Sequence, residues 1–234
     1  PIVMLVAARE GGNPDGIPNE DSRAFDLDDS NLFDLNRFSG LDRWEGGARA
    51  TYGARWALLG KKFDLDVLIG QSYRFDEDSV IFPDGTGLSG NFSDIVGRVA
   101  IGFTNGLELT HRFRIDKNDL AIRRNEIEAR IGNRDNALTV GYVKLNRDLA
   151  IEDLANREEL RLSAQLRVSR RWMLTGGTIQ DLSSGRDSIS QSLGVIYQDE
   201  CLEFRLNYRK NFTADRDFEP GTTITVNVKL RNLG

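Results

Sequence analysis

The stretch LEFRLNYR at residues 202–209 alternates apolar and polar residues along its whole length. Successive side chains of a β-strand point to opposite faces, so this period of two predicts a strand with one apolar and one polar face. The same alternation recurs in LRLSAQLRV at 160–168 and in ITVNVKLR at 224–231. Because no segment keeps the 3.6-residue period of an amphipathic helix, we expect an all-β protein.

Twelve strands are expected from this alternation and from the turn residues between the runs. Strands that cross a bilayer need about 9–11 residues, whereas strands of soluble sheets average about 5–6. Most of the expected strands are of the longer kind, which favours a membrane barrel. Their ranges are 1–9, 43–59, 63–75, 91–104, 106–117, 119–132, 136–147, 158–169, 171–183, 186–198, 200–212 and 221–233.

The connections between these strands are long on one side only. Tight turns are expected at 60–62, 105–106, 133–135, 170–171 and 199–200, and long loops at 10–42, 76–90, 148–157 and 213–220. Every long connection is odd-numbered from the N-terminus, which is the plan of an outer-membrane barrel with long extracellular loops. We therefore expect an antiparallel up-and-down transmembrane β-barrel of about 12 strands, with 10–42 as a long extracellular loop.

Two tryptophans support this expectation. Trp44 and Trp56 are expected at the two ends of one strand, on the same face. At ~3.3 Å per residue and ~45° tilt, their spacing corresponds to about 28 Å along the membrane normal. The apolar band of an outer-membrane barrel is about 25 Å tall, with aromatic residues at each edge.

The composition excludes several classes of protein. The chain has 234 residues, with 31 Lys and Arg against 36 Asp and Glu, a net charge of −5 that argues against nucleic-acid binding. The apolar run 2–8 is far shorter than the ~20 residues of a membrane-spanning helix. The chain opens at Pro1 without an initiator methionine, so we expect a piece of a longer protein. With one histidine and one cysteine, His111 and Cys201, no metal site or cofactor is expected.

Charged residues crowd the polar face of the expected strands. In a barrel this face lines the lumen, where mixed charge supports a hydrated interior, an ion-pair lattice or a protein plug. For any single residue, a solvated wall is the favoured interpretation. The charged residues expected to face the lumen include Arg112, Arg114, Arg161, Arg167, Glu203, Arg205, Arg209, Lys229 and Arg231.

The segment 10–42 is acidic, and three interpretations stay open for it. A solvated loop is favoured over a site for divalent cations, because the spacing of its acidic residues fits no EF-hand. Its apolar residues indicate a loop that folds over the mouth of the barrel.

Two other functions are weighed against a membrane transporter. His111, on the apolar face, suggests a barrel lipase, but no G-x-S-x-G motif accompanies it. A soluble β-sandwich binding module is the second alternative, with the aromatic residues in its core. Cys201 directly follows the tight turn 199–200, and it is either a free thiol or half of a bridge to a segment outside this chain.

Several motifs resemble one known family in their order and spacing. The stretch SRAFDLDDSNLF at 22–33 and the stretch RFSGLDR at 37–43 resemble the LPS-assembly protein family LptD, the organic solvent tolerance proteins. SLGVIY at 192–197, LNYRK at 206–210 and ITVNVKLRNLG at 224–234 agree with the end of that family. The resemblance covers essentially the whole chain and implies the C-terminal part of the outer-membrane barrel.

The resemblance implies a function in the outer membrane of a Gram-negative bacterium. The family is a non-enzymatic lipopolysaccharide translocon, plugged by the lipoprotein LptE and supplied by the periplasmic Lpt bridge through an N-terminal domain. Lipopolysaccharide would enter the outer leaflet through a lateral seam at the last strand. That strand would present Ile224, Val226, Val228 and Leu230 to the seam. Cys201 would match a cysteine that bridges to the absent N-terminal region, with Glu200 where the family often has a second cysteine.

Overall fold

A computed structural model shows the expected alternation as strands of one sheet. It describes residues 1–9, 26–38, 40, 43–76, 82, 84–146, 156–183, 187–213 and 219–230. The strands are β1 (Ile2–Ala8), β2 (Gly47–Leu59), β3 (Phe63–Arg74), β4 (Ile95–Phe103), β5 (Leu107–Ile115), β6 (Ile122–Gly132), β7 (Ala137–Leu145), β8 (Arg157–Arg167), β9 (Trp172–Asp181), β10 (Ser188–Gln198), β11 (Leu202–Asn211) and β12 (Gly221–Leu230).

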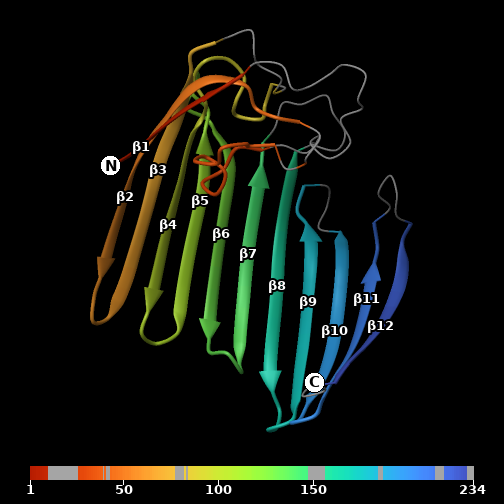
Figure 1. Ribbon diagram of the computed structural model, residues 1–234. Helices are drawn as coiled ribbons and strands as arrows, with labels where there is room; N and C mark the ends of the chain where they lie inside the picture. Colours follow the sequence, from red (N-terminus) through yellow and green to blue (C-terminus); the bar gives the residue numbers. More distant parts are fainter. Residues whose placement is uncertain are drawn as a thin grey trace. The chain divides into compact units, whose positions relative to one another are not determined.

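The sheet has the simplest possible topology. Across the described residues its twelve strands follow one another in sequence order, and each is hydrogen-bonded to its neighbours in the chain (Figure 1). This confirms the predicted all-β, antiparallel up-and-down arrangement. The strands form one sheet and not two, so they do not form the alternative β-sandwich. β1 and β12 end the order and are not paired with each other. No helix of the described chain is long and apolar enough to span a membrane.

The lengths of the connections alternate as the sequence predicts. The even-numbered connections are 60–62, 104–106, 133–136, 168–171 and 199–201, each of three or four residues. Every odd-numbered connection has six residues or more. Because consecutive strands run in opposite directions, all the short turns join the strands at one end, and all the longer connections join them at the other end.

The chain divides into two compact units, which are described separately. The first unit comprises Pro1–Ile101, Thr110–Glu126 and Lys144–Asn156, and the second comprises Gly102–Leu109, Ile127–Val143 and Arg157–Gly234.

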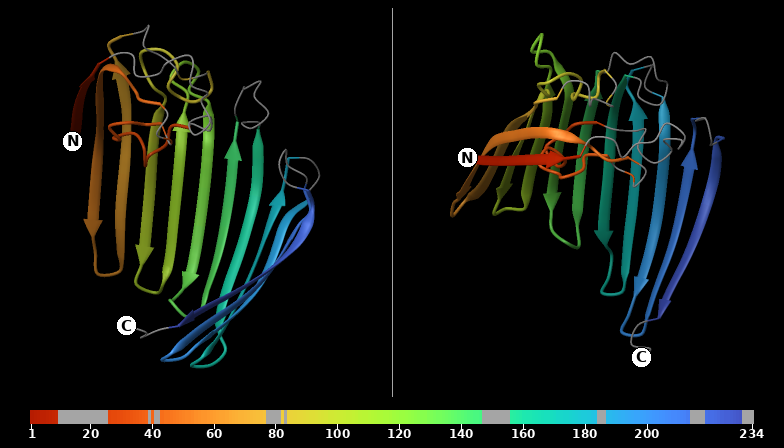
Figure 2. Two further views of the ribbon diagram at one scale, coloured as in Figure 1. Left: turned by 45° about the vertical axis from the view of Figure 1, so that its right-hand side comes forward. Right: turned by 45° about the horizontal axis from the view of Figure 1, so that its top comes forward.

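The core of the first unit lies between the polar face of its strands and the segments that connect them. Segment 26–38 lies near the strand ends where the longer connections are (Figure 2, in orange). Glycine allows its close approach to β3, since a Cβ atom at Gly70 would come within 2.6 Å of Leu32 Cδ2. The core cluster consists of Leu27, Leu32, Phe38, Phe82, Leu88 and Val96.

In the second unit, β8 to β12 pair in antiparallel registers, with one irregularity between Ser188 and Ser190 of β10. The register places Leu206 between Val195 of β10 and Val226 of β12, so that apolar residues form rows across one face. Leu206 and Val226 are both exposed, and Leu193 on the same face is 67% exposed. The apolar face of this unit is therefore open, and no part of the described chain packs over it.

Two predicted strands begin later than expected. β2 starts at Gly47 and not at residue 43, because Glu45 turns toward arginines of the first unit and Gly47 has a positive φ of 84°. Trp44 therefore lies outside β2, and the prediction that it shares a strand with Trp56 is wrong. β4 starts at Ile95 and not at residue 91, since the preceding residues form only the isolated bridge from Phe92 to Tyr73.

Candidate functional site

Four arginines form a row on one face of the first unit, because alternate residues of a strand point to the same side. Arg98 lies in β4, Arg112 and Arg114 in β5, and Arg124 in β6. We call them the arginine row. Each of the four forms an ion pair with an aspartate of segment 26–38.

Arg114 is the most enclosed member of the row, with 1% of its surface exposed. It pairs with Asp26, and its Nε lies 3.4 Å from Asp94 Oδ2. Its Nη1 also donates to the carbonyl of Thr86 at 2.9 Å. A guanidinium has five donors in a fixed fork and stays charged, so a single arginine can hold two connecting segments against the sheet. The other oxygen of Asp26 lies 2.8 Å from Nη1 of Arg124.

Asp29 binds the other half of the row. Its carboxylate oxygens lie 3.3 Å from Arg112 Nε and 3.7 Å from Arg98 Nη1. Arg98 in turn donates to Asp66 of β3 at 2.6 Å. The pairs therefore continue from the connecting segment onto the sheet as a network, in which Arg98 has partners on both.

A second charged cluster surrounds Glu45, which is 3% exposed. Arg37 of segment 26–38 binds both carboxylate oxygens, while Arg49 of β2 lies 3.0 Å and Arg74 of β3 lies 2.9 Å from them. The Arg74 guanidinium also lies over the ring of Phe82, 5.3 Å from its centroid. One buried carboxylate thus holds three buried guanidinium groups together, so the loss of Glu45 would leave three buried cations without the anion that they share.

The carboxylates of these clusters titrate differently. Burial raises the pKa of Asp29 and of Asp94, and the neighbouring arginines offset only part of that effect. Burial acts in the same direction on Glu45, but the hydrogen bond and charge of Arg37, with those of the other arginines, outweigh it and lower the pKa of Glu45. The Glu45 cluster therefore favours the ionised carboxylate, whereas burial disfavours it at Asp29 and Asp94.

The structure corrects two expectations about this region. A solvated acidic loop was favoured for 10–42, but in its described part Leu27 and Leu32 are fully buried and Asp29 is 7% exposed. A solvated wall was favoured for each charged residue, but Arg114 is buried under a connecting segment. Residues 10–25 of this loop lie outside the described part of the chain.

The predicted charged residues of the second unit mostly pair along their own face. Three ion pairs are Arg161 with Glu159 at 2.9 Å, Arg167 with Asp135 at 2.6 Å and Arg205 with Glu203 at 2.6 Å. Lys229 stands opposite Glu203 in the register of β11 and β12. Arg209 is exposed on β11, and Arg231 lies outside the described residues.

Two residues considered for chemistry have defined surroundings. Cys201 is an exposed free thiol, and its backbone N–H donates to Asp199 Oδ1 at 2.9 Å in the tight turn. His111 Nε2 lies 2.9 Å from Asn125 Oδ1, so the imidazole pairs with an amide of the neighbouring strand.

β12 is an edge strand. It pairs with β11 from Gly221 to Leu230, and its other side faces no strand of the described chain. All ten of its residues are exposed. The predicted seam residues Ile224, Val226, Val228 and Leu230 share its apolar face, each with more than half of its surface exposed.

Residues 1–172 match the family model of LptD, described as LPS transport system D. The match covers well over half of the chain. The chain belongs to the LptD family. A curated relative, the LPS-assembly protein LptD of Nitrosococcus oceani, is 26% identical over 93% of this chain. The aligned region covers 30% of that relative, so the chain spans less than a third of its length.

In this LptD-family chain, sequence reasoning identified Arg112 and Arg114 but missed their partners. Asp94 and Glu45 fall within the expected strands 91–104 and 43–59, but the structure places them just before β4 and β2, where strand alternation does not apply. Arg98 and Arg124 could have been found, because each falls at a polar position of an expected strand.

Proposed function

We propose that this chain is part of an outer-membrane translocon for lipopolysaccharide, and that β12 forms one side of a lateral seam through which the lipid enters the outer leaflet. The observation that carries the proposal is the edge strand itself. β12 is hydrogen-bonded along one side only, and apolar residues alternate along it. The name of the curated relative, an LPS-assembly protein, supports the substrate.

Unpaired backbone groups cost several kcal/mol each in lipid, so the free side of β12 would need a pairing strand in the membrane. In the complete barrel β12 would pair with another strand. That pair would join the two ends of the up-and-down order, so it could open without breaking any other strand pair. Lipopolysaccharide would need such an opening, since its saccharide is hydrated and its acyl chains are not.

The two faces of the sheet suit the two parts of this substrate. The open apolar face would contact membrane lipid, and aromatic residues occur near the strand ends as expected at the membrane interfaces. Trp172 and Tyr197 lie 5.0 Å apart at the short-turn end of the second unit, while Tyr73 and Phe92 lie 4.7 Å apart at the longer-connection end of the first. The polar face would line the lumen and meet the saccharide and the LptE plug.

We propose no catalytic role for the chain. The alternative of a barrel lipase rested on His111, and the 2.9 Å contact of its Nε2 with Asn125 Oδ1 accounts for this side chain as a polar pair between neighbouring strands. The periplasmic Lpt bridge would deliver lipopolysaccharide through the N-terminal domain, and Cys201 would form a disulfide with that region. The exposure of its thiol at the short-turn end supports this.

The seam is tested by locking it in the full-length protein. Thr225→Cys, combined with a cysteine in the strand that adjoins β12 in the complete barrel, should stop lipopolysaccharide export when oxidised and restore it when reduced. Asn207→Cys with Thr225→Cys is the matched control, because these residues face each other in β11 and β12, which stay paired. Export that continues with the seam locked would refute the proposal.

A further inference from the structure

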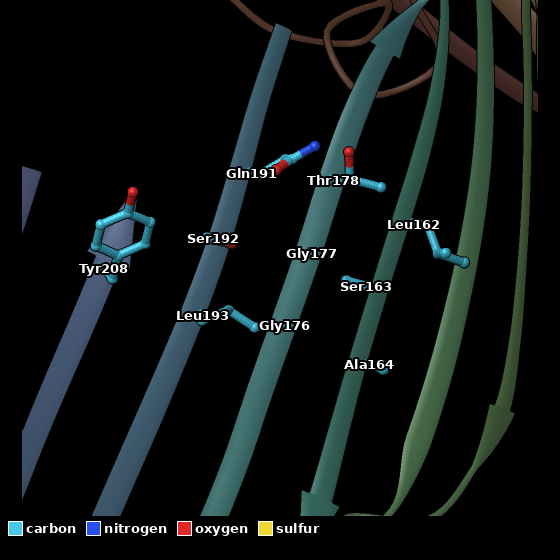
Figure 3. A pocket seen from close by; sticks show the side chains of 10 residues that line it. All are labelled: Leu162, Ser163, Ala164, Gly176, Gly177, Thr178, Gln191, Ser192, Leu193 and Tyr208. Atoms are coloured by element: carbon cyan, nitrogen blue, oxygen red, sulfur yellow. The ribbon is translucent and has the colours of Figure 1, made fainter. Parts of the chain in front are cut away.

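A groove of about 330 Å³ crosses β8 to β11 in the second unit (Figure 3). It lies on the apolar face, because its floor consists of Ala164 and Gly176, which share a cross-strand row with Leu193 and Tyr208. Ala164 and Gly176 are small, and they lie between larger residues. Leu193 and Tyr208 form one wall of the groove and Leu162 the other.

The sheet itself does not require a glycine at position 176. A Cβ atom there would meet only Leu193 Cδ2 at 3.5 Å and a carbonyl at 3.8 Å, which are ordinary contacts. At the neighbouring Gly177, on the opposite face, a Cβ would come within 3.2 Å of the Leu162 carbonyl oxygen. Packing thus explains why position 177 has no side chain. At position 176 the missing side chain leaves the hollow above the sheet.

One end of the groove is polar. The next row toward the longer connections contains Thr178 and Gln191, and Lys210 is opposite Gln191 in the register. Among the described residues, the buried Thr178 Oγ1 has no hydrogen-bond partner. The Lys210 ammonium lies 4.8 Å from the centre of the Phe212 ring. The Gln191 amide therefore lies at one end of the apolar groove, and Lys210 follows it in the same cross-strand row.

We propose that this groove binds an acyl chain of lipopolysaccharide on the outer wall of the barrel, with Lys210 at a lipid A phosphate. The apolar floor matches the chain, the Gln191 amide matches the carbonyl that links it to the sugar, and the Lys210 ammonium matches the anionic headgroup. The proposal rests on the proposed function, which directs the longer connections and hence the polar end toward the outer leaflet. β9 and β10 are close in strand order to β12, so the groove would receive lipid that has just left the seam.

The test uses the full-length protein in cells, with a benzoylphenylalanine photo-crosslinker in place of Tyr208. Lipopolysaccharide should be captured at this position. Gly176→Leu fills the groove and should remove most of the capture, while Lys210→Gln should reduce it about fivefold, as expected for loss of one cation near a lipid headgroup. Ala54→Leu is the matched control, because it enlarges an exposed residue of the apolar face outside the groove. It should leave the capture unchanged.

A second photo-crosslinker, in place of Val226 of β12, separates the groove proposal from the seam proposal. Capture of lipopolysaccharide at 226 but only phospholipid, or nothing, at 208 would overturn the groove and leave the proposed function intact. Capture at neither position would contradict both. Whether each variant has folded is shown by heat-modifiable migration on gels, which identifies folded barrels. If Gly176→Leu fails to fold, Gly176→Ala and Lys210→Gln still decide, and unchanged capture in both would overturn the groove.

Discussion

Glu45 holds three buried arginines, so its charge should be needed for the seating of segment 26–38. Glu45→Gln should lower the free energy of opening of this segment by about 3–5 kcal/mol at neutral pH, the usual result of leaving buried charges unpaired. Hydrogen exchange of the amides of 26–38 measures this opening. Glu108→Gln, at an exposed carboxylate of β5, is the control and should change little.

The same substitution has a defined pH dependence. The pKa of Glu45 is lowered in the folded protein, so its contribution is complete above the ordinary value of 4.5 and is lost as the pH falls through the folded value. The wild type and Glu45→Gln should therefore differ at neutral pH and converge in acid. A constant difference between pH 7 and pH 3 would contradict the assignment. The contribution of Asp29 to stability should have the opposite pH dependence and become more favourable as the pH falls, since burial raises its pKa in the folded protein.

Arg114 should be as critical as Glu45, because it binds two connecting segments at once. Arg114→Met keeps most of the volume but leaves Asp26 and Asp94 without their buried partner, at a cost of about 3–5 kcal/mol. Trypsin cleavage after Arg37, which is buried in the seated segment, should become much faster. Arg55→Met is the control. The Arg55 side chain is 59% exposed, and its surface pair with Asp66 is worth at most about 1 kcal/mol.

Alternation in the sequence was sufficient to place Arg112 and Arg114 on the polar face, because the side-chain period of a strand is fixed by geometry. It could not pair them with Asp26 and Asp29. Those contacts join residues far apart in the chain, and they depend on how an irregular segment packs. Nor could it show that Glu45 is buried, since the expected strand 43–59 included Glu45, whereas β2 begins only at Gly47.

At the scale of elements, glycine in β3 should determine how closely segment 26–38 approaches the sheet. A methyl group at Gly70 would stand 2.6 Å from Leu32 Cδ2 and 2.8 Å from the Tyr52 carbonyl oxygen. Gly70→Ala should therefore destabilise the seated segment by about 1–3 kcal/mol, as overpacking does. Gly102→Ala in β4 meets nothing within 4 Å and is the control. Equal protease resistance of the two variants would refute this account.

The existence and order of the strands were predicted more accurately than the residues at which the strands begin. Their order and the alternation of short and long connections follow from periodicity and turn residues, which are local properties. The starts of β2 and β4 were placed four residues too early. Residues there resemble strand in sequence, but Glu45 is held by arginines and Ser93 bonds to the Ser72 carbonyl at 2.8 Å, both contacts with residues distant in sequence.

At the scale of the whole molecule, the two ends of the sheet limit what the chain can do alone. β1 pairs with only the Gly47–Gly53 part of β2, and β12 pairs with β11 alone. Because open sheet edges are costly in lipid, the isolated 234-residue chain should not form a stable pore. Planar-bilayer recordings should show no steady single-channel conductance, in contrast to the full-length protein. A stable native-like conductance from the chain alone would contradict this.

We expect the reach of Asp26 across the chain to affect the order of assembly. Its partners Arg114 and Arg124 follow it by 88 and 98 residues, whereas each strand needs only the strand beside it. Closing so long a loop costs entropy that short hairpins do not incur. Maturation should therefore proceed in two kinetic phases, a fast zippering of hairpins and a slower docking of 26–38 once β6 has formed.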